Sequence, residues 1–111
     1  MTTTPRMNAK GTLQDKSGQT WIRFENVRAS YGAFVAPFEF VDVPPEARVV
    51  FEEHERHILR QELSFLDEFR RRISGFGLEV VWEGDPKRTL ALDVQTCEGE
   101  VSFRSEALAR K

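Results

Sequence analysis

The chain has 111 residues, of which 40% are hydrophobic and 31% are charged. That length fits one domain, and the apolar share is too high for a disordered chain. Sixteen basic and eighteen acidic residues leave a net charge of −2. This balance gives no strong electrostatic attraction to nucleic acid or to an anionic membrane.

The single cysteine, Cys97, cannot close a disulfide within the chain, so the composition favours a reducing cytoplasm. No apolar run approaches the length of about twenty residues that a membrane span needs, and the N-terminus lacks the apolar stretch of a signal peptide. Residues 1–10 show no periodicity. We therefore expect a flexible tail over 1–10 and a single domain over 11–111.

Three strands are predicted in the first part of the chain, over residues 12–16, 20–29 and 31–43. Apolar and polar residues alternate in them with a period near two. In the third strand Phe34, Phe38 and Phe40 fall on one face. Pro37 cannot donate a hydrogen bond to a neighbouring strand, so this strand is expected to lie at a sheet edge or to bend there.

One long amphipathic helix is predicted over residues 52–74. At about 100° per residue its apolar side chains fall in one arc and its charged side chains fall opposite. Acidic residues begin the segment and three arginines end it, as the helix dipole favours. The preceding residues 48–51 are expected to form a short strand or an irregular entry. The apolar arc consists of Phe51, Ile58, Leu59, Leu63, Phe65, Leu66, Phe69 and Ile73.

Three further strands are predicted over residues 78–83, 89–97 and 100–104, with a short helical turn over 106–110. Short turns join the strands of each group, so both groups are expected to be antiparallel. The helix must bury its apolar face against this sheet. The sequence therefore predicts an α+β fold in the order βββ-α-βββ, whose antiparallel sheet stays open or forms a partly closed barrel.

His54 and His57 are the residues that suggest a metal site. A zinc protease motif places two histidines four residues apart, whereas these are three apart. A zinc ion would need Cys97 or a distant carboxylate as a third ligand. The pattern therefore favours a solvated helix face, and no metal or other cofactor is predicted.

Glu62 falls inside the apolar arc of the predicted helix. A lone buried carboxylate is costly, so its pKa would rise unless it is paired or lies at the edge. A raised pKa would suit a general acid. Because no nucleophile or second carboxylate accompanies it, we favour a structural role, either at the rim of a dimer interface or paired with Arg23, Arg28 or Arg104.

Four basic residues, Arg71, Arg72, Lys87 and Arg88, could form a patch beside the aromatic strands. Such a patch is typical of surfaces that bind single-stranded nucleic acid. However, Asp67 and Glu68 lie four residues before Arg71 and Arg72, where they can pair with them. The pattern therefore disfavours nucleic-acid binding.

Nine phenylalanines, two tryptophans and one tyrosine exceed what a small core needs. Phe34, Phe38 and Phe40 around Pro37 are expected to form an exposed apolar edge. A partner protein or a second copy of the chain would cover such an edge, so the sequence predicts a protein partner and suggests a homodimer.

The order of elements is similar to that of OB-fold barrels, which bind oligonucleotides or sugars. It also resembles the middle of the acidic, dimeric secretion chaperones, which clamp a partner chain without catalysis. Neither resemblance rests on a residue motif.

No catalytic set, phosphate-binding glycine loop or cofactor motif occurs in the sequence. We therefore predict a cytoplasmic, non-catalytic protein-binding module of adaptor, inhibitor, immunity or chaperone type. One alternative is an OB-like protein that binds single-stranded nucleic acid. A second alternative is a small enzyme or metal site that uses Glu62 or the pair His54 and His57.

Overall fold

A computed structural model describes residues 9–105 of the chain. The predicted helical turn over 106–110 and most of the predicted tail lie outside these residues. Lys10, which is predicted in that tail, instead begins the first strand. In chain order the elements are β1 (Lys10–Gln14), β2 (Thr20–Glu25), β3 (Arg28–Ser30), β4 (Ala33–Phe40), α1 (Pro45–Leu59), a 3-10 turn (Leu63–Phe65), α2 (Leu66–Gly75), β5 (Glu79–Trp82), β6 (Arg88–Cys97) and β7 (Glu100–Ser105).

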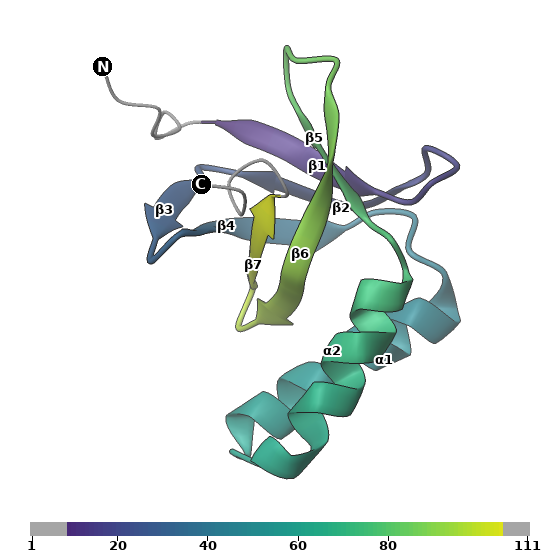
Figure 1. The fold of residues 1–111 in the computed structure, drawn as a ribbon, viewed down its shortest axis with the longest axis vertical. Coiled ribbons are helices and arrows are strands. Elements are labelled where there is room, and N and C mark those ends of the chain that lie inside the picture. Colours follow the sequence, from purple (N-terminus) through teal and green to yellow (C-terminus); the bar gives the residue numbers. More distant parts are fainter. Residues whose placement is uncertain (1–8, 106–111) are drawn as a thin grey trace.

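The strands form one antiparallel sheet that closes into a barrel (Figure 1). The strand order is β2-β1-β5-β6-β7-β4-β3, and an additional pairing of β2 with β4 joins the two sides. Closure pairs the backbone groups that an open sheet would leave free at its edges. The α+β class and the antiparallel sheet are thus confirmed, and the sheet is a closed barrel. Within residues 9–105, β3 lies outside this ring and pairs with β4 alone.

The strand predicted over residues 20–29 is two strands, because Asn26 adopts a left-handed backbone conformation with φ of 58° between them. Four strands rather than three therefore precede the helices in the described part of the chain. Tyr31 and Gly32 both have positive φ and form the tight turn between β3 and β4. Tyr31 therefore belongs to a turn and not to the predicted strand.

β4 changes neighbours at Pro37. On one side it pairs with β3 as far as Val35 and with β2 from Phe38 onward. On the other side it pairs with β7, where the Phe38 amide donates to the Gly99 carbonyl at 3.2 Å. Adjacent residues direct their amide nitrogens to opposite sides, so the Pro37 nitrogen faces the gap between β3 and β2. The proline is accommodated there. Of the two alternatives predicted for this strand, a sheet edge or a bend at Pro37, the sheet edge is wrong, because β4 pairs with neighbours on both sides.

The single helix predicted over residues 52–74 is not confirmed, because two helices lie side by side in its place (Figure 1). Gln61 has a φ of 58° and separates α1 from α2. α1 begins at Pro45, where the fixed φ of proline suits a first helical position. Residues 48–51 are consequently helical, and the predicted strand or irregular entry is wrong.

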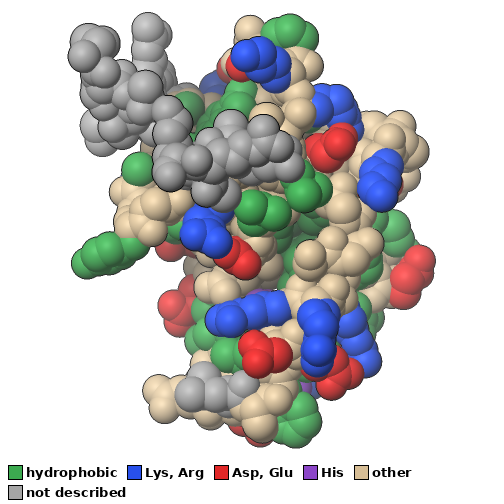
Figure 2. All heavy atoms as spheres, in the orientation of Figure 1, with side chains coloured by type: hydrophobic (Ala, Val, Ile, Leu, Met, Phe, Trp, Pro, Cys, Tyr) green, Lys and Arg blue, Asp and Glu red, His purple; other side chains and the backbone are tan. Residues whose placement is uncertain are grey.

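The apolar arc of the predicted helix is only partly buried. Phe51 of α1 and Phe69 and Ile73 of α2 are buried, whereas Leu59 and Phe65 at the connection between the helices are exposed. On the side drawn in Figure 2, charged side chains of both signs cover the part of the molecule where the helices lie. None of the helices within residues 9–105 has the length and apolar character to cross a membrane.

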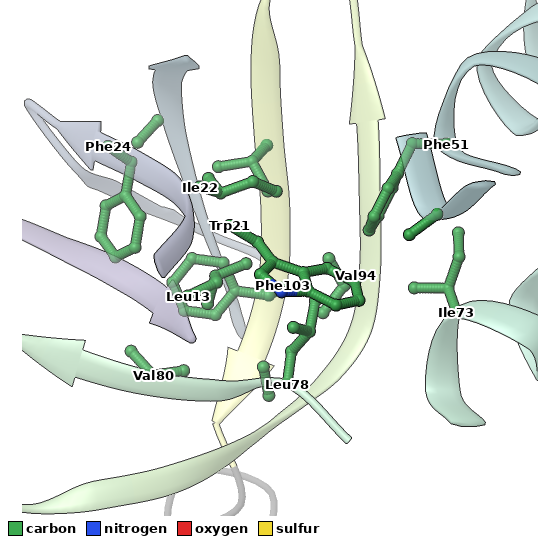
Figure 3. Packing of buried hydrophobic residues seen from close by; sticks show 14 of the residues in the cluster. Leu13, Trp21, Ile22, Phe24, Phe51, Ile73, Leu78, Val80, Val94 and Phe103 are labelled. Carbon is green, nitrogen blue, oxygen red and sulfur yellow. The ribbon is translucent and has the colours of Figure 1, made fainter. Parts of the chain in front are cut away.

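The barrel interior and the helix pair share one hydrophobic core. Phe51 and Ile73 reach from the helices toward Val94 and the other strand side chains (Figure 3). The helices therefore pack against β6 and cover part of the barrel core. Aromatic rings fill much of the interior, since Phe24 lies 5.2 Å from Phe103 and 5.5 Å from Trp82 between ring centroids.

Candidate functional site

A hollow of about 620 Å³ lies against the four neighbouring strands β4, β2, β1 and β5. Strands β4, β2 and β1 contribute residues 37–39, 23–25 and 10–12, and the end of β5 with the first residue of the following turn contributes residues 81–83. These four segments come from both halves of the chain: the pairings of β1 join three of them, and the closure of the barrel by β2 and β4 adds the fourth.

One row of paired residues crosses the floor of the hollow. Gly11 is opposite both Phe24 and Trp82, and Phe24 is opposite Phe38. Phe24 is buried in the core, so the side chains of this row point into the barrel. Because neighbouring residues of a strand point to opposite faces, the residues on either side of the row point outward and form the walls.

Gly11 is required in this row by the close approach of its neighbours. A Cβ atom at this position would lie 2.7 Å from the Val81 carbonyl oxygen and 2.9 Å from Cζ of Phe24. The glycine therefore lets the Phe24 ring and strand β5 pack closely beneath the hollow.

The first wall of the hollow consists of Glu39, Arg23, Thr12 and Val81, which are opposite one another across the strands. The Arg23 side chain forms an ion pair with Glu39, and its Nε donates to Glu39 Oε2 at 2.8 Å. Both side chains remain more than half exposed. Cross-strand pairs of opposite charge contribute modestly to stability and hold both side chains in place.

The second wall contains Glu25, Lys10 and Glu83. Lys10 is opposite Glu25, and the Glu83 amide donates to the Lys10 carbonyl at 2.9 Å. All three side chains belong to exposed residues, and within residues 9–105 none of them forms an ion pair. The hollow as a whole therefore carries three carboxylates and two basic groups.

The predicted exposed edge of Phe34, Phe38 and Phe40 is not formed. The Phe34 ring packs 5.3 Å from Trp82, and Phe40 packs 5.8 Å from Phe51. Phe38 packs edge-on against Phe40 at 5.0 Å and is the one member of the three that lines the hollow. The aromatic surplus thus serves largely to fill the barrel, and the homodimer that it suggested stays a prediction.

The predicted basic residues do not form one patch. Figure 1 shows the turn between β5 and β6 at the opposite end of the molecule from the helices. Arg72 forms the predicted ion pair with Glu68, at 2.7 Å. Asp67 does not pair with Arg71 as predicted but with Arg70, at 3.7 Å.

Arg88, the last residue of that basic set, uses its guanidinium for hydrogen bonds to neighbouring residues of the barrel. Its guanidinium donates to Glu79 at 2.7 Å, to Gln14 Oε1 at 2.7 Å and to the Asp15 carbonyl at 3.1 Å. Lys87 lies in the preceding turn, which the Asp85 carboxylate stabilises by accepting from the Lys87 amide at 3.0 Å.

Glu62 lies in the connection between the helices, not within a helix. Its carboxylate is 2.7 Å from Nδ1 of His57, whose ring stacks on Phe65 at 4.8 Å. The partners predicted for Glu62 are used elsewhere: Arg23 pairs with Glu39, Arg28 with Glu100 and Arg104 with Asp93. The carboxylate therefore ties the connection to α1.

His54 is buried, with 1% of its surface exposed, and neither ring nitrogen has a hydrogen-bond partner within the described residues. Burial lowers the pKa of the imidazole, and the nearby charges of Arg70 and His57 lower it further. The solvated helix face predicted for this residue is wrong. No group of three histidine, cysteine or acidic side chains in residues 9–105 is arranged to hold a metal ion.

The sequence analysis did not predict the hollow, although the alternation of residues in β1 and β2 indicates some of its outward side chains. Alternation places Lys10 and Thr12 on the outer face of β1, and Arg23 and Glu25 on the outer face of β2. The alignment of these residues with Glu83 depends on the register of β1 against β5, which no local pattern shows.

Comparisons of the chain with models of protein families, with curated proteins and with solved structures find no match. The function is therefore argued from the geometry and charge of this chain alone.

Proposed function

We propose that this chain is a non-catalytic protein-binding module of adaptor, inhibitor, immunity or chaperone type, and that the hollow across β4, β2, β1 and β5 is its binding surface. The observation that carries the proposal is the hollow itself, which has a backbone floor and walls with charges of both signs. Complementary charges of both signs give a protein interface its specificity and orientation. The single cysteine supports a cytoplasmic location.

The charge of this surface argues for protein rather than nucleic acid. Nucleic-acid binding depends on basic side chains that neutralise phosphates. Here Glu25, Glu39 and Glu83 outnumber Lys10 and Arg23. A phosphate backbone entering the hollow would meet an excess of negative charge, whereas a protein segment can match both signs.

The candidate catalytic groups are occupied by structural contacts. Glu62 and His57 pair with each other, and His54 is enclosed between the helices beside Phe69. A general acid or base must reach the reacting atom of a substrate. None of these three side chains lines the hollow. We therefore assign them a structural role.

A photo-crosslinking amino acid at Thr12 tests the proposal, because Thr12 lies in the first wall between Arg23 and Val81. Irradiation in an extract of the native cell should join the chain to one defined protein. The same amino acid at Ser74, an exposed position of α2, serves as the matched control and should not yield that adduct. A nucleic-acid adduct, or the same protein captured from both positions, would contradict the proposal.

A further inference from the structure

We infer that the hollow accepts an extended segment of a partner protein that carries two basic residues three positions apart. The inference rests on the proposed function and specifies the chemistry of the partner. It follows from three features of the hollow: its closed backbone edges, its unbalanced charge and the spacing of its two unpaired carboxylates.

The closed edges decide how a partner can bind. β1 pairs with β2 and β5, and β2 pairs with β1 and β4, so the backbone groups of these strands are used within the barrel. A partner therefore cannot add to the sheet here as a further strand. It must lie over the outer face and contact side chains, along the floor that runs across the strands.

The charge decides the sign of the partner. Arg23 and Glu39 neutralise each other on the first wall. On the second wall Glu25 and Glu83 flank Lys10, and none of these three side chains forms an ion pair within residues 9–105. One lysine cannot balance two carboxylates, so a complementary segment brings positive charge.

The spacing decides the form of the segment. Glu25 of β2 is opposite Lys10 on one side of β1. On the other side Glu83, the first residue after β5, donates its amide to the Lys10 carbonyl, so the backbones of Glu25 and Glu83 are two strand spacings apart, about 9.6 Å. A polyproline II segment rises about 3.1 Å per residue with three residues per turn, which places residues i and i+3 on one face about 9.3 Å apart. Two lysines or arginines at these positions can each meet one carboxylate.

The uncharged part of the hollow suits the rest of such a segment. Thr12 and Val81 are half-buried and lie next to each other in the first wall, and the exposed Pro37 lines the β4 end. These side chains offer uncharged contacts between the charged positions. We therefore expect the segment to lie with its basic face toward Glu25 and Glu83 of the second wall and its apolar face toward Thr12 and Val81, which form the uncharged end of the first wall.

Nuclear magnetic resonance titration of the full chain with designed peptides tests the inference. The probe is the peptide Pro-Lys-Pro-Pro-Lys-Pro, and two matched peptides are Pro-Pro-Lys-Lys-Pro-Pro and Pro-Glu-Pro-Pro-Glu-Pro. We expect the first peptide to shift the amide signals of residues 10–12, 23–25 and 81–83. Equal shifts with either matched peptide, or no localised shifts, would overturn the inference.

The double variant Glu25→Gln/Glu83→Gln should bind the first peptide about tenfold more weakly, because both charge-complementary contacts are lost. The control variant Glu46→Gln/Glu98→Gln removes the same charge at two exposed positions outside the hollow and should bind like the original chain. Equal weakening in both variants would show a general charge effect and would overturn the inference.

The two proposals fail in distinguishable ways. If crosslinking at Thr12 captures a protein but the basic peptide does not bind, the proposed function stands and the basic segment is wrong. If Thr12 yields no protein adduct and the peptide does not bind, both are wrong.

Discussion

His54 is a buried polar side chain whose ring nitrogens are not satisfied by hydrogen bonds within the described residues. Its ring is buried between the helices, 6.2 Å from the Phe69 ring, and both of its nitrogens lack a partner within residues 9–105. An unsatisfied buried polar group costs about 1–3 kcal/mol. The packing of the ring carbons of neutral His54 beside Phe69 offsets part of this cost.

Replacing His54 with leucine should therefore stabilise the chain. The change removes two unsatisfied nitrogens from the core and improves the helix propensity of α1. We expect the free energy of unfolding at pH 7 to rise by about 1 kcal/mol, measured by urea denaturation. His57→Leu is the matched control, since that ring is bonded to Glu62. A loss of stability in His54→Leu would contradict the assignment of two unsatisfied nitrogens to this ring.

Stability should also depend on pH through His54. Its folded pKa is lowered, whereas in the unfolded chain it takes up a proton near the ordinary value of about 6.5. The unfolded state therefore binds more protons between these two pKa values, and the free energy of unfolding falls as pH drops below about 6.5. Denaturation between pH 8 and pH 5 should show this loss, and the His54→Leu variant should show less of it. Equal pH dependence in both proteins would refute the assignment to His54.

At the scale of the elements, alternation in the sequence predicts the last three strands well. The predictions 78–83, 89–97 and 100–104 correspond to β5, β6 and β7 within about two residues. Tight turns bound these strands, such as the turn at Glu98 and Gly99, which both have positive φ. The alternation in β6 is interrupted by a register shift between Leu92 and Gln95, where Asp93 has a φ of 53°, but the ends of the strand are not affected. Local chemistry is sufficient there to define the strands.

The helix pair shows where local pattern fails. The apolar arc continues through residues 59–65 with Glu62 as its one charged member there, so periodicity predicts one helix across them. The break is made by Gln61, a residue that gives no glycine or proline signal, and by the contact of Glu62 with His57. Tertiary contacts decide this connection, and they override the helical preference of the sequence.

The candidate site was predictable only in part for a related reason. The outward residues of each strand can be read from alternation, but their arrangement into two walls is set by the pairing of β1 with β5 and of β2 with β4. The pairing of β1 with β5 joins segments far apart in the chain, and the pairing of β2 with β4 passes over the intervening strand β3. The aromatic residues predicted to form an exposed edge instead pack in the barrel that these pairings close.

Replacing Gly11 with alanine should disturb the packing of β1 against β5. In Gly11→Ala the new Cβ would meet the Val81 backbone oxygen, which cannot move without shifting β5. We expect a loss of about 2 kcal/mol in the free energy of unfolding, as for overpacked cores. The control Gly75→Ala adds a Cβ in open space at the end of α2 and should be neutral or slightly stabilising. If the two variants were equally stable, the close approach of the strands at Gly11 would be wrong.

At the scale of the whole molecule, the barrel and the helix pair differ in how they are held. Barrel strands such as β1 and β7 pair on both sides and enclose the aromatic interior. The helices instead bury few side chains, chiefly Phe51, Phe69 and Ile73, and enclose the unsatisfied His54 between them. Segments with few buried contacts open locally before the whole chain unfolds.

This difference predicts unequal amide hydrogen exchange. At pH 7.5 the amides of α1 and α2 should exchange faster than those of β4 and β7, because local opening of the helix pair leaves the barrel pairing intact. At pH 5.5, after correction for the intrinsic exchange rate, the gap should widen, since protonation of His54 favours the opened helices. In His54→Leu the widening should be lost while the difference at pH 7.5 remains. Uniform protection across helices and strands at both pH values would mean that the helix pair and the barrel unfold as one unit, with the burial of His54 coupled to the entire core.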